Sequence, residues 1–143
     1  MKVKEIMTAP VKSININSSI YQAAKMMYTY DVGILPVEKN GKIVGMITDR
    51  DIVLRIAAQN LEPQKASVED AMTSYVISCS ENDDIEEATE LMEENHVHRL
   101  LVFDNEKAVG ILSIGDLARK TADDRIIHEV IRVISEPVNI SYT

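Results

Sequence analysis

The sequence predicts an α+β protein made of two tandem units, each with the order strand, helix, strand, strand, helix. Residues 45–51 (Gly-Met-Ile-Thr-Asp-Arg-Asp) recur 65 positions later as residues 110–116 (Gly-Ile-Leu-Ser-Ile-Gly-Asp). Shifting the chain by this interval aligns residues 3–55 with residues 68–120 without a gap, and 17 of the 53 aligned pairs are identical. A repeat of this length indicates a duplicated structural unit.

Periodicity and turn residues place the elements of the first copy. Alternating apolar and polar residues indicate strands, whereas apolar residues three and four apart indicate helices. Ser18 is expected to cap the first long helix, and Asn40-Gly41 is expected to form the turn of a hairpin. In order, the expected elements are a helical lead-in at 1–9, a strand at 11–16, a helix ending near Tyr30, strands at 32–37 and 43–48, and a helix at 49–60.

The second copy repeats these steps, and a tail follows it. Its expected elements are a strand near Val76, a helix from Asp84 to Glu94 capped by Asp83, a hairpin from Val97 to Leu112, and a helix from Gly115. Apolar spacing predicts a further helix at 123–136 and a strand at 138–142. The expected division is a first domain at 1–60, a linker at 61–66, a second domain at 67–122, and a C-terminal helix and short strand at 123–143. The apolar stripe of the tail is expected to pack either on the repeats or on another chain.

Composition argues against several classes of protein. A net charge of −8 argues against binding to a nucleic-acid backbone, which needs clustered lysine and arginine. No apolar run approaches the roughly 20 residues of a membrane span, and no signal-peptide pattern opens the chain. The single cysteine, Cys79, rules out an intramolecular disulfide and is expected to be a buried apolar side chain. We expect a cytoplasmic protein with no nucleic-acid or membrane partner.

The repeated unit resembles the CBS domain, a regulatory unit named after cystathionine beta-synthase. The resemblance rests on the motif glycine-apolar-apolar-hydroxyl-x-x-aspartate, which follows a hairpin in both copies, and it covers nearly all of residues 1–120. Two copies in tandem are similar to the CBS pair, or Bateman module. The resemblance implies two units packed about a pseudo-twofold axis, a homodimer, and clefts that bind adenosine-containing ligands such as AMP, ADP, ATP, S-adenosylmethionine or NAD.

The same resemblance implies two ligand sites, each built around one aspartate and completed by the other copy. The first site would comprise Met46, Thr48, Asp51, Ile77, Val97, His98 and Arg99, and the second would comprise Lys12, Val32, Gly33, Ile111, Ser113 and Asp116. In each, the aspartate and the hydroxyl residue would bind the ribose, because an ionised carboxylate offers two strong acceptors to a pair of neighbouring hydroxyl groups. Met46 and Ile111 would form the walls.

The two copies differ in charge beside the strand that follows the first long helix. Residues 97–100 (Val-His-Arg-Leu) resemble the phosphate-contacting His-Arg pair in the gamma subunit of AMP-activated kinase, whereas residues 32–35 read Val-Gly-Ile-Leu. We therefore expect the Asp51 site to prefer phosphorylated nucleotides. The Asp116 site is expected to bind more weakly or to take a less anionic ligand, such as S-adenosylmethionine or adenosine.

Other interpretations stay open. The two aspartates would also suit the positive end of a helix dipole without any ligand, and a scaffold or interaction protein with vestigial clefts would show the same motif. An enzyme or a metal site is not expected, because no nucleophile with an oriented base and no cluster of metal ligands can be identified. We expect a regulatory module that requires no cofactor and that signals to a separate enzyme or transporter through a conformational change.

Overall fold

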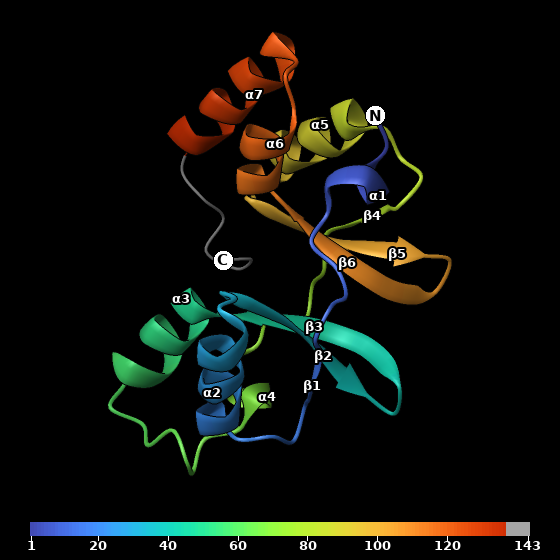
Figure 1. The fold of residues 1–143 in the computed structure, drawn as a ribbon. Helices are drawn as coiled ribbons and strands as arrows, with labels where there is room; N and C mark the ends of the chain where they lie inside the picture. Colours follow the sequence, from blue (N-terminus) through green and yellow to red (C-terminus); the bar gives the residue numbers. More distant parts are fainter. Residues whose placement is uncertain (137–143) are drawn as a thin grey trace. The chain divides into compact units, whose positions relative to one another are not determined.

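The structure, a computed structural model, describes residues 1–136 (Figure 1). The chain forms two compact units that do not coincide with the two halves of the sequence repeat. The first, called here the Asp51 unit, comprises residues 12–76, and the second, the Asp116 unit, comprises residues 1–11 together with the described chain from Ile77 onward. Each unit holds one three-stranded sheet and several helices, which confirms the predicted α+β class.

The sheet of the Asp51 unit has the order β1-β2-β3, with β1 parallel and β3 antiparallel to the central β2. The elements of this unit are β1 (Ile14–Asn15), α2 (Ile20–Tyr30), β2 (Ile34–Lys39), β3 (Lys42–Thr48), α3 (Asp49–Ile52), a π-helical turn η1 (Val53–Ala57) and α4 (Val68–Ala71). Apolar side chains from α2, the sheet and α4 form one buried cluster, including Ile20, Leu35, Val37, Ile47 and Val68. This burial gives α2 and the sheet a common core.

The Asp116 unit repeats this arrangement, with α1 as the counterpart of α4, and adds one helix, α7. Its elements are α1 (Val3–Ile6), β4 (Ser78–Ser80), α5 (Ile85–Asn95), β5 (Arg99–Asp104), β6 (Lys107–Ser113), α6 (Ile114–Lys120) and α7 (Asp124–Ser135). The strand order β4-β5-β6 and the strand directions match those of the Asp51 unit. Both hairpins also carry a bulge at the same place, after Val37 and after Val102.

In each unit, a short segment that belongs to the other copy of the repeat pairs with the last strand of the sheet. Thr73 exchanges two backbone hydrogen bonds with Met46 on β3, at 2.8 and 2.9 Å, and Thr8 exchanges two with Ile111 on β6, at 2.9 and 3.0 Å. A Cβ atom on Gly45 would lie 2.5 Å from the carbonyl oxygen of Thr73, so this close approach requires glycine. Residues 72–73 therefore complete the unit of the first copy, and residues 7–8 complete that of the second.

The local expectations were largely correct, with small shifts. The cap of α2 is Ser19 and not Ser18, because the hydroxyl of Ser19 accepts from the amide of Gln22, whose side chain returns to the Ser19 amide. The cap position of α5 is held by Asp84 and not by Asp83, and the Asp84 side chain makes no capping hydrogen bond. The regular helix expected at 49–60 is α-helical only to Ile52, and the π-helical turn η1 follows it.

The predicted tail helix is confirmed as α7, which packs on α5 and α6 in the Asp116 unit. Ile126, Val130 and Val133 are buried there, whereas Ile131 and Ile134 keep 58% and 56% of their surface exposed. The tail therefore packs on its own repeat through one face only. The strand expected at 138–142 lies outside the described residues. Within residues 1–136, no helix is both long and apolar enough to span a bilayer.

Candidate functional site

Thr48 and Asp51 form a reciprocal cap where β3 ends and α3 begins. The Thr48 hydroxyl accepts from the amide of Asp51 at 3.0 Å, and Oδ2 of Asp51 accepts from the amide of Thr48 at 3.0 Å. Such a capping box satisfies two amides that a helix N-terminus otherwise leaves unpaired. The hydroxyl and the aspartate of the motif are therefore spaced three residues apart for a structural reason, whatever else they bind.

The Asp51 carboxylate is almost completely buried, which changes its pKa. Only 2% of Asp51 is exposed, and burial raises the pKa of its carboxyl group, opposed by the Thr48 amide and by the charge of Arg55. The Nε of Arg55 lies 3.9 Å from Oδ1 of Asp51, while its Nη1 donates to the carbonyls of Ala71 and Met72 at 3.1 and 3.0 Å. The guanidinium is thus committed mainly to the end of α4.

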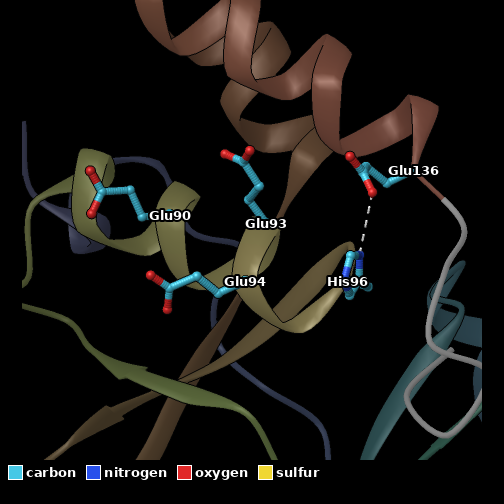
Figure 2. Close-up of a pocket in the computed structure, with 5 residues that line it drawn as sticks. All are labelled: Glu90, Glu93, Glu94, His96 and Glu136. Carbon is cyan, nitrogen blue, oxygen red and sulfur yellow. Dashed lines mark ion pairs between the residues drawn. The ribbon is translucent and has the colours of Figure 1, made fainter.

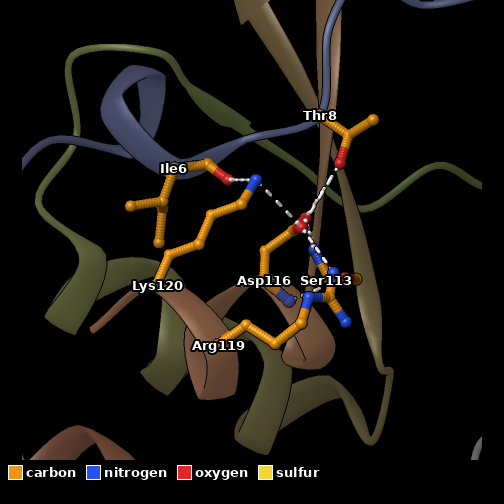
Figure 3. Close-up of polar contacts among 6 residues, drawn as sticks. All are labelled: Ile6, Thr8, Ser113, Asp116, Arg119 and Lys120. Carbon is orange, nitrogen blue, oxygen red and sulfur yellow. Dashed lines mark hydrogen bonds and ion pairs between the residues drawn. The ribbon is translucent and has the colours of Figure 1, made fainter. Parts of the chain in front are cut away.

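Ser113 and Asp116 form the same cap at the start of α6, and Figure 3 shows the groups around it. Oδ2 of Asp116 accepts from the Ser113 amide at 3.0 Å, and the Thr8 hydroxyl donates to both carboxylate oxygens at 3.3 and 3.4 Å. Arg119 and Lys120 place nitrogens 3.2 and 3.4 Å from Oδ1. Asp116 is therefore surrounded by donors from its own unit.

The Thr73 hydroxyl is the counterpart of the Thr8 hydroxyl, and it behaves differently. Thr73 meets β3 in the register in which Thr8 meets β6, and it is 7% exposed. Its Oγ1 has no hydrogen-bond partner among the described residues. A buried hydroxyl without a partner is uncommon and costs stability.

The remaining predicted site residues divide between the two units. In the Asp51 unit, Met46 on β3 is 5% exposed and Val32 is half-buried. The Gly33 carbonyl accepts from the Asp49 amide at 2.9 Å. The amino group of Lys12 lies 5.1 Å from the centre of the Tyr30 ring. These contacts bring Gly33 to the start of α3 in its own unit.

In the Asp116 unit, Ile77 and Val97 are buried and Ile111 is half-buried. The His98 carbonyl accepts from the Ile114 amide at 3.0 Å, while Nε2 of His98 is buried without a partner among the described residues. Arg99 is half-buried at the start of β5. Each predicted site combines residues of both units, so these two combinations stay predictions.

Sequence reasoning did not assign a role to the four residues that approach the two aspartates, which are Thr8, Arg55, Arg119 and Lys120, or to Thr73, the counterpart of Thr8. The identity of Thr8 with Thr73 in the repeat was a signal that both threonines occupy equivalent positions. The cation four residues after each aspartate, Arg55 or Lys120, was a second signal, and the second copy adds Arg119 three residues after Asp116. Residues at these spacings meet on a helix surface.

A cavity of about 430 Å³ lies beside α5 and the end of α7, and Figure 2 shows the side chains that line it: Glu90, Glu93, Glu94, His96 and Glu136. Nδ1 of His96 lies 3.7 Å from Glu136, and Arg132 pairs with Glu93 at 2.9 Å. Within residues 1–136, no three His, Cys, Asp or Glu side chains are placed so that they could hold a metal ion together. The Cys79 thiol is buried, and this burial raises its pKa to about 12, so it is a neutral core side chain.

Comparison with known proteins agrees with this architecture. CBS domain-containing protein YhcV of Bacillus subtilis (strain 168) is 39% identical over 116 residues, covering 81% of this chain and 82% of that protein. CBS domain protein TA0289 of Thermoplasma acidophilum is 25% identical with a TM-score of 0.81, covering 96% of this chain and 78% of that one. The CBS domain pair of protein MJ0100, solved in complex with 5′-methylthioadenosine and S-adenosyl-L-methionine, is 31% identical with a TM-score of 0.74, covering 83% of this chain and 94% of that one.

The family model of the CBS domain matches the chain twice, over residues 3–58 and over residues 68–123. These two ranges coincide closely with the two copies found from the repeat, and each ends just after one of the capped aspartates. The chain therefore belongs to the CBS domain family and carries two CBS domains in tandem.

Proposed function

We propose that this protein is a regulatory module that senses an adenosine-containing nucleotide, either AMP, ADP or ATP, or S-adenosylmethionine. Pairs of CBS domains are regulatory modules, which supports the general class. The observation that carries the specific proposal is the hydroxyl–aspartate pair, which occurs in both copies at the same strand-to-helix junction. The related pair of MJ0100 was solved with two adenosyl ligands, which supports the ligand class.

The chemistry of the pair suits a ribose. An ionised carboxylate that already accepts one amide with one oxygen retains lone pairs for the hydroxyl groups of a diol, and such charge-assisted bonds are stronger than neutral ones. Thr48 and Asp51 would then contact ribose at one site, and Ser113 and Asp116 at the other. His98 and Arg99 would contact phosphate, as the resemblance implies.

The proposed output is a change of conformation. A ligand with different affinities for two arrangements of the units shifts their populations, and a partner protein reads that shift. The partner would be a separate enzyme or transporter, and the protein would act as a cytoplasmic homodimer without catalytic activity of its own.

The test is ligand-dependent thermal unfolding with AMP, ADP, ATP, S-adenosylmethionine and NAD. A ligand at one hundred times its dissociation constant adds about 2.7 kcal/mol to the stability of the native state, enough to raise the midpoint by several degrees. Asp51→Asn and Asp116→Asn are sharper variants than alanine, because asparagine keeps an oxygen that accepts the capping amide. A midpoint shift that one of these variants abolishes supports the proposal. No shift with any of the five ligands contradicts it.

A second candidate is an interaction or scaffold protein with vestigial clefts. The Asp116 carboxylate is already contacted by Thr8, Arg119 and Lys120 of its own unit, which favours this alternative for at least one copy. The same experiment separates the two functions, because a scaffold would gain no stability from an adenosyl ligand.

A further inference from the structure

We propose that ligand binding in this chain is confined to the copy that carries Asp51, because Arg119 occupies the carboxylate of Asp116 and closes the second copy. The inference rests on the proposed function and specifies which of its two sites is active. It is carried by a difference between two equivalent positions in the repeat. Arg119 of the second copy aligns with Leu54 of the first.

Arg119 reaches a carboxylate that has almost no exposed surface. Its Nη2 donates to Oδ1 of Asp116 at 3.2 Å, and its side chain is 68% exposed whereas that of Asp116 is 2% exposed. The guanidinium therefore approaches from solvent, the direction from which a ligand would come. With Lys120 at 3.4 Å from the same oxygen and the Thr8 hydroxyl on both, the acceptor capacity of Asp116 is used by its own unit (Figure 3).

The backbone beside Asp116 accommodates this arginine. A Cβ atom on Gly115 would lie 2.8 Å from Nη1 of Arg119, so the guanidinium rests where the side chain of residue 115 would begin. The first copy has Arg50 at the position of Gly115 and Leu54 at that of Arg119. The two copies thus differ at both positions on which this contact depends.

Among residues 1–136, fewer donors reach Asp51 than reach Asp116. Arg55 approaches Oδ1 only to 3.9 Å, since its Nη1 donates to carbonyls at the end of α4. The Thr73 hydroxyl, more than nine-tenths buried, has no partner among the described residues, although its counterpart Thr8 donates to Asp116. Thr73 bridges to β3 as Thr8 bridges to β6, so a ligand hydroxyl that contacts both the Thr73 hydroxyl and Asp51 would take the place of the direct contact seen between Thr8 and Asp116. This would satisfy a buried polar group and gives this copy a specific reason to bind.

The test exchanges the two aligned residues. Leu54→Arg gives the first copy the arginine of the second, and Arg119→Leu gives the second copy the leucine of the first. Val53→Arg and Arg132→Leu are the matched controls, because they make the same changes of charge at exposed positions, one next to Leu54 in the sequence and one where the arginine pairs with Glu93. AMP, ADP, ATP and S-adenosylmethionine are titrated separately into each purified full-length protein by isothermal calorimetry, after circular dichroism has checked that each variant folds.

We expect one binding site per wild-type chain, lost in Asp51→Asn and retained in Asp116→Asn. Leu54→Arg is expected to weaken binding about tenfold or more, the effect of one charge-assisted hydrogen bond, and Arg119→Leu is expected to add a second site. Two sites in the wild type, or one site that depends on Asp116, would overturn this inference while supporting the proposed function. No binding to any variant would overturn both. If Leu54→Arg does not fold, the number of sites in Arg119→Leu still decides.

Discussion

The side chain of Thr8 donates a hydrogen bond to Asp116, at 3.3 Å to Oδ1, and so joins the beginning of the chain to the last helix of the second repeat. The two residues are 108 positions apart. The equivalent threonine of the first repeat, Thr73, lies in the same register beside β3 but has an unpartnered hydroxyl among the described residues. Two threonines at equivalent positions of the repeat thus differ in whether the hydroxyl has a hydrogen-bond partner.

This difference predicts opposite effects of the same substitution. Thr8→Val removes a donor to a buried carboxylate and is expected to lower the free energy of unfolding by about 1 kcal/mol or more. Thr73→Val replaces an unsatisfied hydroxyl with a methyl group and is expected to be neutral or stabilising. Urea denaturation of both variants checks this expectation. Equal losses of stability in the two variants would contradict it.

The close contact between Gly45 and residue 73 predicts a severe effect of added volume. Gly45→Ala places a Cβ atom 2.5 Å from the backbone oxygen of Thr73. Residues 72–73 must therefore move away from β3, at a cost of roughly 1–3 kcal/mol. Gly115→Ala is the control, since its Cβ would meet only the flexible end of Arg119. Chemical denaturation should show a large loss for the first variant and a small one for the second; the reverse order would refute the packing argument.

Glu129 on α7 predicts a pH dependence of stability. Partial burial and the nearby charges of Glu93 and Glu90 raise the pKa of Glu129, and one of its carboxylate oxygens is buried without a partner among the described residues. The folded protein therefore holds this proton more tightly than the unfolded chain, so stability falls as the pH rises from the ordinary glutamate pKa through the raised one. Glu129→Gln removes this loss.

We expect Glu129→Gln to be more stable than the wild type at neutral pH, with the difference shrinking as the pH falls towards that of an ordinary glutamate. Thermal unfolding between acidic and neutral pH measures this difference. Glu87→Gln, an exposed position on α5, removes the same charge and is expected to leave the pH profile unchanged. A difference that does not vary with pH would contradict the assignment.

Burial on α7 predicts which face of the tail stabilises the Asp116 unit. Ile126 is 1% exposed, and Ile126→Ala is expected to cost about 2–5 kcal/mol, because it leaves a cavity against the neighbouring helices. Ile134 is 56% exposed, and Ile134→Ala is expected to change stability by less than about 0.5 kcal/mol. Denaturant midpoints of the two variants compare these effects directly, and similar losses would show that the exposed face is also covered.

The elements of the fold could be predicted from local pattern because each one depends on neighbouring residues. Helical spacing of apolar residues located α2, α5 and α7, and the Asn-Gly pair located the turn between β2 and β3, where Asn40 and Gly41 both have positive φ. Boundaries moved by up to three residues, as at β1, which was expected at 11–16 and spans Ile14–Asn15. At the Ser19 cap the shift is one residue, because a hydroxyl and an amide three residues later decide the start of that helix.

The candidate site could be predicted only in part. The motif identified Thr48, Asp51, Ser113 and Asp116, and the structure adds that both pairs are capping boxes. The motif did not indicate that Arg119 donates to Asp116 whereas Arg55 donates to carbonyls at the end of α4, although both cations follow their aspartates closely in the sequence. Which acceptor a long side chain chooses depends on the surrounding backbone.

The sequence by itself determined the duplication, the order of the elements and the family, because a gapless repeat and its periodicities are local properties of the chain. Only the tertiary structure decided that residues 7–8, from the first copy, pair with β6 in the Asp116 unit, and that residues 72–73, from the second copy, pair with β3 in the Asp51 unit. It also decided that Asp116 accepts a hydrogen bond from Thr8, whereas the Thr73 hydroxyl finds no partner within residues 1–136. The physical reason is that both facts depend on hydrogen bonds between segments far apart in the chain, whose partners no local pattern specifies.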